Sequence, residues 1–213
     1  MKKLFILCAA IMLMFALGSC KGGIVDPVDG LGAEPLSENS GWLLAGTAPQ
    51  KYLLYADESE FHGGTKSACI KSTAAEYADG DFATVLQVFN AKDFTGKKVE
   101  FSGYVKTHEV ERMCGLWMRI DDSVAAVLRF DNMGDRPVTG TTEWSRYSVV
   151  LDVPDCAAYI NIGMLLNGGG QAWLGDVSFR EVPDDTPVTY TVPDIDYLLN
   201  LPDFPVDLEF EGM

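Results

Sequence analysis

Apolar and polar residues alternate along most of the chain in short segments that turn residues separate. Val, Ile, Phe and Tyr dominate these segments, and Gly, Asp and Pro lie between them, a pattern typical of β-strands. No segment has a 3.6-residue apolar stripe of helical length. The sequence therefore predicts an antiparallel β-sandwich or barrel, with strands at 83–90, 99–107, 114–121, 125–131, 146–153, 159–166 and 172–182.

The segment CGLWMRID, residues 114–121, divides cleanly into two faces at a period of two. Cys114, Leu116, Met118 and Ile120 form an apolar face, and Trp117 and Arg119 lie on the opposite one. The same alternation along neighbouring strands adds further polar or aromatic side chains to that opposite face. The candidate ligand-binding residues are Gln87, Tyr104, Lys106, Trp117, Arg119 and Asn161.

A sheet with one buried and one solvated face suits such a surface. Aromatic rings can stack on the apolar faces of sugar rings, and the polar side chains can bind hydroxyl groups, so carbohydrate is the first candidate ligand. The alternative is that Trp117 covers the sandwich under a loop and that Arg119 pairs with Asp131 or Glu100. Exposed aromatic residues also stabilise cross-strand pairs without binding a ligand.

Several motifs in chain order resemble the galactose-binding-like jelly rolls, including the carbohydrate-binding modules of xylanases and cellulases. They are GW at 41–42, HGGTKSACIKS at 62–72, TGKKVEFSGYVKT at 95–107 and WLGDVSFREV at 173–182. GLWMRID, RFDNMGDRPVTGTTEW and VVLDVP resemble more closely an uncharacterised bacterial family of this fold, some of whose members are fused to helix-turn-helix regulators. The resemblance implies an all-β antiparallel jelly-roll sandwich over residues 41–182.

The same resemblance implies a structural calcium ion, because galactose-binding-like domains often hold one near an edge. Asp176 is the carboxylate that it assigns to this site, with the backbone carbonyls of Gly64 and Lys66 close by. Asp57 and Glu58 are weaker candidates of the same kind. Hard oxygen ligands fit calcium, although no ligand spacing like that of an EF-hand is present.

The N-terminus has the features of a bacterial lipoprotein signal. Two lysines precede an uncharged apolar run at 4–17, which is too short to span a bilayer comfortably. The LGSC sequence at 17–20 resembles a lipobox, so residues 1–19 are the expected signal peptide and Cys20 the acylated residue. Residues 20–40 are rich in Gly, Pro and acids and are expected to form a flexible tether. We expect attachment to the cell envelope, at the outer membrane, through this lipid alone; the sequence does not indicate the leaflet.

The region after the predicted sandwich, residues 183–213, is acidic and rich in proline. Within it, PVDLEFEG at 205–212 alternates again. Related jelly rolls have a strand of the type NLxFE before the GW motif, and here that place is loop-like. We hypothesise that Val206–Phe210 returns to fill this strand position; the alternative is a frayed tail.

The loop DNMGDRPVTGTTEW, residues 131–144, is long and polar, which is more typical of functional connections than of short turns. Asp131, Asn132, Arg136 and Trp144 could form the rim of a groove. Alternatively, Arg136 fixes the loop to Asp131 or Asp135. For Trp144 the sequence favours a core position at the start of the next strand.

Charge and motifs exclude other functions. The formal charge is −15, and removing Lys2 and Lys3 with the signal gives −17, which disfavours nucleic-acid binding. Cys69, Cys114 and Cys156 cannot all pair and have no zinc spacing; Cys114 suits the core. With two histidines and no GxSxG or HExxH motif, no enzyme is indicated.

The sequence thus predicts a non-catalytic binding module on an envelope lipoprotein, with carbohydrate as the expected ligand. The expected contact residues are Trp117, Arg119, Tyr104, Gln87 and Asn161. The alternative is a structural or protein-interaction module whose partner is an envelope protein. A third interpretation, a sensor for a small effector, rests only on the resemblance to domains fused to regulators.

Overall fold

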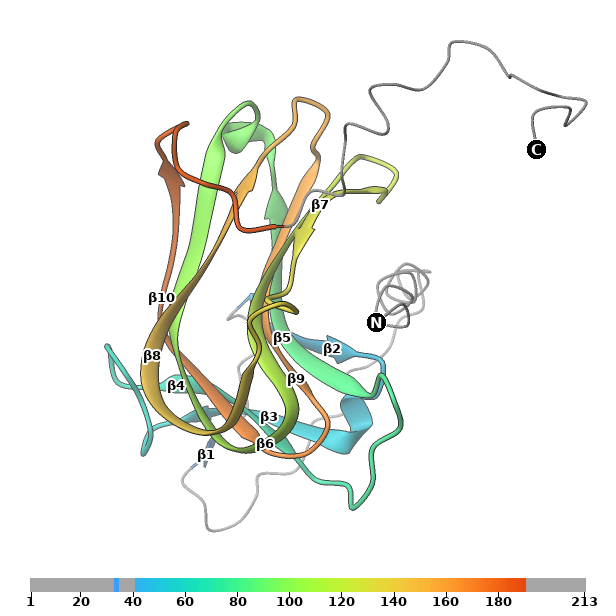
Figure 1. Ribbon diagram of the computed structural model, residues 1–213, viewed down its shortest axis with the longest axis vertical. Helices are drawn as coiled ribbons and strands as arrows, with labels where there is room; N and C mark the ends of the chain where they lie inside the picture. Colours follow the sequence, from blue (N-terminus) through green and yellow to red (C-terminus); the bar gives the residue numbers. More distant parts are fainter. Residues whose placement is uncertain (1–32, 35–40, 191–213) are drawn as a thin grey trace, which may run out of the picture.

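The computed structural model describes residues 33–34 and 41–190. The signal peptide, Cys20 and the hypothetical strand Val206–Phe210 lie outside the described residues. Strands are the main secondary structure of the described chain (Figure 1). They are β1 (Ala33–Glu34), β2 (Leu43–Gly46), β3 (Tyr52–Asp57), β4 (Ser67–Ser72), β5 (Phe82–Asn90), β6 (Lys98–Asp121), β7 (Val127–Asp131), β8 (Val138–Asp152), β9 (Tyr159–Asn167) and β10 (Gln171–Val182). Two short 3₁₀ turns, Pro49–Lys51 and Lys92–Phe94, precede β3 and β6.

The strands form two antiparallel layers, and the 24-residue strand β6 connects them because it belongs to both. Its first half pairs with β10 on one side and β8 on the other, and β4, β3 and β1 extend this first sheet. Its second half pairs with β9 and β7, and β5 and β2 extend the second sheet. The predicted all-β antiparallel fold is confirmed as a two-layer sandwich (Figure 1).

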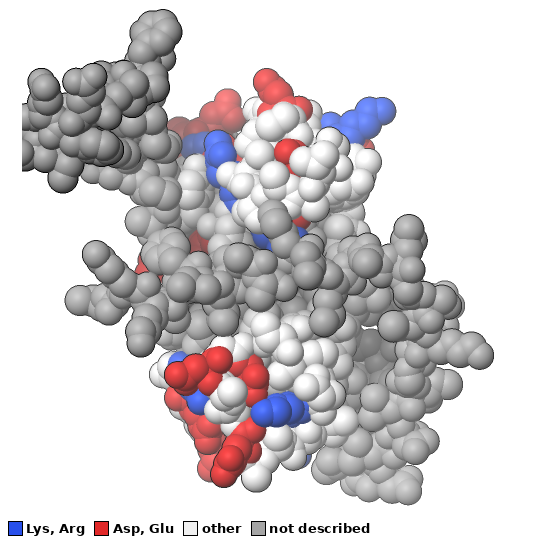
Figure 2. Space-filling view, turned by 90° about the vertical axis from the view of Figure 1, so that its right-hand side faces the viewer, with Lys and Arg blue, Asp and Glu red and all other residues white. Residues whose placement is uncertain are grey.

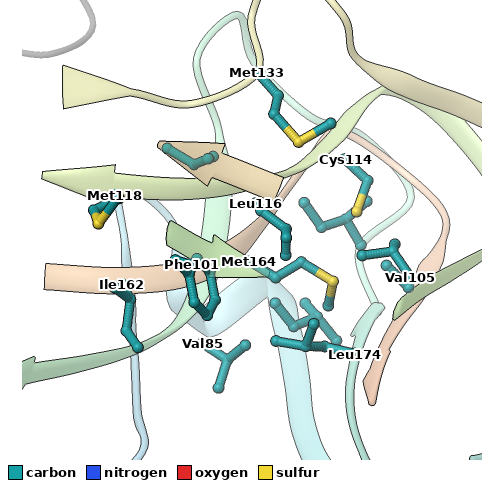
Figure 3. Close-up of a cluster of buried hydrophobic side chains, with 14 of the residues drawn as sticks. Val85, Phe101, Val105, Cys114, Leu116, Met118, Met133, Ile162, Met164 and Leu174 are labelled. Atoms are coloured by element: carbon teal, nitrogen blue, oxygen red, sulfur yellow. The ribbon is translucent and has the colours of Figure 1, made fainter. Parts of the chain in front are cut away.

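The apolar faces of the two sheets meet in one buried core (Figure 3). Phe101 and Val105 from the first half of β6 and Leu174 from β10 lie opposite Leu116 and Met118 from its second half. Alternate residues of β9, among them Met164, continue the layer. Since each strand contributes every second side chain, the period-two pattern of the sequence accounts directly for this packing.

Two predicted boundaries differ from the structure. The segments at 99–107 and 114–121 were predicted as separate strands, but they are two halves of β6. The pairing of β6 with β8 shifts register between Thr107 and Cys114, and Glu109 there has φ 52°. Because such bulges bend a strand without ending it, β6 can pass from one sheet to the other. The predicted long loop is also shorter than expected, since β8 already begins at Val138.

Residues 183–190 continue beyond β10 along the edge of the sandwich. The N–H of Thr189 donates to the carbonyl of Val150 at 3.0 Å, and Tyr190 donates its hydroxyl to Asp152 at 2.8 Å. Arg129 of β7 also binds Asp152 and lies 5.9 Å from the centre of the Tyr190 ring. This segment therefore covers the open side between β7 and β8.

The cysteines of the described residues are all free. Cys114 is fully buried in the core, as predicted, and its burial raises the pKa of the thiol to about 12. Cys69 is also buried, whereas Cys156 is exposed. Within the described residues, no helix is long and apolar enough to cross a membrane.

Candidate ligand-binding site

Three of the five predicted contact residues come together on the outer face of the second sheet. Trp117 and Arg119 project from β6, and Asn161 projects from β9 directly opposite Arg119. Gly163 lies opposite Trp117 in the same pair of strands. The alternation in CGLWMRID therefore places these side chains on the face away from the core.

Trp117 lies over β9 instead of projecting into solvent. A Cβ atom on Gly163 would be 2.8 Å from the indole Nε1, so the ring passes directly over this glycine. Nε1 donates a 2.7 Å hydrogen bond to the hydroxyl of Thr84 on β5. Trp117 is only 6% exposed and packs with Phe82, Leu86 and Leu165. The prediction of an open stacking ring at Trp117 is wrong, because the glycine opposite lets the indole lie down on the sheet.

Arg119 and Asn161 share one buried carboxylate, that of Asp121. The Oδ2 atom of Asp121 accepts hydrogen bonds from Nε of Arg119 at 3.0 Å, from its Nη2 at 2.9 Å and from Nδ2 of Asn161 at 2.9 Å. Asp121 is 3% exposed, and its Oδ1 makes no hydrogen bond within the described part of the chain. A buried acceptor without a donor is costly, so this carboxylate depends on Arg119 and Asn161 for its stabilisation.

The expected alternative partners of Arg119 have other contacts. Asp131 binds Arg136, with 2.6 Å between Oδ2 and Nη2, and Glu100 binds Arg146 and Arg180. Arg136 also contacts Asp135 at 2.8 Å, so the expectation that it fixes this loop is confirmed with both carboxylates.

Exposed apolar side chains border the group formed by Arg119, Asp121 and Asn161. Tyr159 lies opposite Asp121 on β9 and is 45% exposed. Val88 lies opposite Asn161 on β5, and Val127 lies opposite Asp121 on β7. Asp121 and Tyr159 were not among the predicted contacts, although they continue the same alternation as Arg119 and Asn161. On the side of the molecule seen in Figure 2, charged side chains gather near two ends of the described surface.

Tyr104 and Gln87 do not belong to this face. Tyr104 projects from the first half of β6, on the outer face of the first sheet, where the His62 ring stacks on it at 3.7 Å and 16°. Gln87 lies opposite Ile162 of the core layer and close to Gly41. The bend of β6 explains why Tyr104 is separated from Trp117. Gln87 is absent from the outer face because the odd-numbered residues of β5 face the core.

Trp144 is not a core residue, in contrast to its prediction. It is half-buried on the outer face of the first sheet, against Tyr55, Cys69 and Trp173. Its Nε1 donates to Oε1 of Glu60 at 2.9 Å, and Lys106 binds the other oxygen of Glu60 at 3.0 Å. Its polar ring nitrogen therefore has a partner at the surface that a core position would not offer.

The calcium ion that the resemblance assigns to Asp176 stays a prediction. Asp176 does lie against the HGG turn, since a Cβ on Gly63 would be 2.9 Å from its carboxyl carbon. Its nearest polar side chain is His62, with 3.9 Å between Oδ2 and Nδ1. Asp57 binds Ser59 and Trp173, and Glu58 binds Lys66. No cluster of three His, Cys, Asp or Glu side chains occurs in the described ranges. With one carboxylate, most of the oxygens that calcium takes would have to come from backbone carbonyls, such as those of Gly64 and Lys66, or from water.

Comparison with known proteins supports the fold. No family model matches the chain. The chain is 41% identical over 171 residues to YbfP of Bacillus subtilis (strain 168), described as an uncharacterised HTH-type transcriptional regulator. That match covers 80% of this chain, which spans only 56% of the regulator.

Two solved structures are similar in shape. One is the enzymatically active domain of tailspike protein 4 from bacteriophage CBA120, with TM-score 0.51, 16% identity and coverage of 67% of this chain and 20% of that one. The other is the CBM22-1 xylan-binding domain of Paenibacillus barcinonensis Xyn10C, with TM-score 0.49, 14% identity and coverage of 68% and 87%. The fold is an antiparallel jelly-roll β-sandwich.

Proposed function

We propose that this protein is a non-catalytic carbohydrate-binding module and that the sugar binds on the outer face of the second sheet. The observation that carries the proposal is the exposed ring of Tyr159, which lies directly opposite Asp121, the carboxylate that holds Arg119 and Asn161. A ring with an exposed face can stack on a sugar, and the polar group beside it can bind the hydroxyl groups of that sugar.

The exposed ring of Tyr159 takes the stacking role that the sequence assigned to Trp117. Tyr159 is opposite Asp121, and directly opposite side chains in an antiparallel pair lie about 5 Å apart at Cβ. An aromatic ring beside a few fixed polar groups is the usual composition of a small-ligand site. Trp117 forms the floor next to it, held by Thr84.

We further propose that the module is attached to the bacterial envelope through acylated Cys20 and the tether at 20–40. The motif at 17–20 and the length of the apolar run support this. A lipid anchor would keep the binding face near the cell surface while the tether lets it move. Incorporation of a labelled fatty acid, lost in Cys20→Ala, tests the anchor independently of the ligand.

A protein partner is the second candidate, because the same face is largely apolar. Leu43, Val88, Val127 and Tyr159 are each more than 40% exposed and surround the buried cluster of Trp117. Contiguous exposed apolar surface often marks a protein interface. The name of the Bacillus relative adds a further possibility for the shared domain, a ligand-sensing role within a regulator.

A glycan array with residues 21–213 tests the proposal. The parent is compared with Arg119→Ala/Tyr159→Ala, and Phe61→Ala is the matched control, since Phe61 is 44% exposed on the other side of the sandwich. We expect the parent and the control to bind the same glycans and the double variant to lose binding with an unchanged circular-dichroism spectrum. Absence of glycan binding by the parent would overturn the proposal and favour the protein partner.

A further inference from the structure

The outer face of the first sheet carries a row of three serines between two arginines. Ser102 of β6 lies opposite Ser178 of β10 on one side and Ser148 of β8 on the other. Directly opposite residues project to the same face, so the three hydroxyl groups line one strip across the sheet. Arg180 lies on β10 and Arg146 on β8, on either side of this strip.

A single buried carboxylate organises the two arginines. The Oε2 atom of Glu100 accepts from Nε and Nη2 of Arg180 at 2.8 and 2.6 Å, and from Nη2 of Arg146 at 3.3 Å. Arg146 also donates to the hydroxyl of Ser102 at 3.0 Å. Because both Nη2 atoms contact the same oxygen, they lie within about 6 Å of each other, close enough for one bridging anion with hydrogen bonds of normal length.

The charges of this cluster do not cancel. The Glu100 side chain is 9% exposed, whereas those of Arg146 and Arg180 are 48% and 57% exposed. Within the described residues, neither arginine has another carboxylate partner. Each guanidinium has five N–H donors, and several on each remain available. A local charge of +1 therefore faces solvent in a chain whose net charge is −15.

We propose that Arg146, Arg180 and the hydroxyl groups of Ser148 and Ser178 form a binding site for a tetrahedral oxyanion, a phosphate or sulfate group, while the buried Ser102 positions Arg146. Guanidinium groups match the geometry of such anions, and serine hydroxyls can donate to their remaining oxygens. Glu100 keeps both guanidinium groups within reach of one anion, but its negative charge competes with that anion for them. The site is on the opposite side of the sandwich from the proposed sugar site and does not depend on it.

Titration of the full chain with inorganic phosphate and with sulfate, at constant ionic strength against chloride, tests this site. We expect Arg146→Gln and Arg180→Gln each to weaken binding about tenfold, the loss of one charge-assisted hydrogen bond. The double variant is expected to lose binding. Lys97→Gln is the matched control, because it removes one positive charge near Arg180, from an exposed ion pair with Glu181 that projects to the opposite face of β10.

Glu100→Gln distinguishes anion binding from a purely structural role of the two arginines. It removes the competing negative charge, so anion binding should strengthen severalfold even if the melting temperature without anion falls. Unchanged binding in the double arginine variant would overturn the proposal, as would equal weakening in Lys97→Gln or weaker binding in Glu100→Gln.

Vesicles of equal parts phosphatidylcholine and phosphatidylglycerol identify the source of the anion. Vesicle binding that the double arginine variant loses and inorganic phosphate displaces would assign the site to a lipid headgroup. Phosphate binding without vesicle binding would assign it to a soluble or glycan-linked anion. Both results support the site, and absence of binding to phosphate, sulfate and vesicles overturns it.

Discussion

The two outer faces of the sandwich share one fold and one long strand, yet they are built differently. On the first sheet, polar side chains pair with each other: Glu60 binds Lys106 and Trp144, and Glu100 binds two arginines. On the second sheet, an apolar cluster surrounds Trp117, and a single buried oxygen of Asp121 is left without a partner. The first face is therefore a network of ion pairs and hydrogen bonds with one positive charge in excess at Glu100. The second face is an apolar surface around one polar group, and the exposed ring of Tyr159 beside that group is why we place the sugar there.

Gly163→Ala should have the largest effect on stability, because it disrupts the packing of Trp117 on the second sheet. The new Cβ would contact the carbonyl oxygen of Val85 and lie 2.8 Å from the indole Nε1. Since the backbone cannot yield easily, we expect a loss of about 3 kcal/mol in the free energy of unfolding, typical of overpacking. Urea unfolding measures it.

Gly64→Ala is the control for this substitution. No atom lies within 4 Å of its Cβ position, and only its φ of 59° opposes a side chain, at a cost of about 1 kcal/mol. Equal losses in the two variants would show that the Trp117 ring does not depend on the space above Gly163.

Trp173→Phe should destabilise the first sheet by about 2 kcal/mol, because it removes a hydrogen bond to a carboxylate. Nε1 of Trp173 donates to Oδ2 of Asp57 at 2.8 Å in a buried site. Burial raises the pKa of Asp57, but hydrogen bonds from Ser59 and Trp173 and from backbone N–H groups lower it further, below the usual range. The stabilisation is therefore present above the unfolded pKa of about 3.9 and is lost as pH falls through the folded pKa.

The pH dependence provides the measurement. The difference in unfolding free energy between the parent and Trp173→Phe should be largest near neutral pH and should shrink below pH of about 4. A penalty that stays constant into acid would contradict the role assigned to Asp57.

Trp117→Phe, the same substitution on the second sheet, should cost less, about 1 kcal/mol for one neutral hydrogen bond. Thr84 still donates its hydroxyl to the carbonyl of Met164 at 2.9 Å after the change, so no donor is stranded. Because neither partner is ionisable, we expect this loss to be independent of pH between 4 and 8. A loss that changes with pH would contradict the hydrogen bond to Thr84 as its cause.

The sequence predicted the fold class and the core side of β9 and of both halves of β6, because alternation at a period of two follows directly from strand geometry. It predicted the grouping of Trp117, Arg119 and Asn161 for the same reason. It assigned the wrong face to Gln87, since the odd-numbered residues of β5 face the core. It could not place Tyr104, because alternation does not show that β6 bends and changes sheets near Glu109. The shift also changes which parity faces the core, from Val99 and Phe101 to Cys114 and Leu116.

The burial of Trp117 was also beyond the sequence pattern. It depends on Gly163 of the neighbouring strand β9 and on the hydroxyl of Thr84 on β5, which only strand register brings together. The position of Asp121 was predictable, since alternation places it on the same face of the strand as Trp117 and Arg119. Alternation alone, however, does not show that one carboxylate oxygen is paired and the other is not.

The smallest expected effects concern the exposed edge of the paired network on the first sheet. Lys106→Gln removes the contact with Glu60, a hydrogen bond that raises the pKa of this lysine although its partial burial acts in the opposite direction. We expect a loss of about 0.5 to 1 kcal/mol, because the pair is partly shielded and Glu60 also binds Trp144.

Lys66→Gln is the comparison, since its pair with Glu58 is about half exposed on both sides. Its loss should be about 0.3 kcal/mol and should vanish in high salt. Equal losses of unfolding free energy in the two lysine variants would mean that the first face is a set of independent surface pairs and not a connected network. The proposed difference between the two faces would then be wrong.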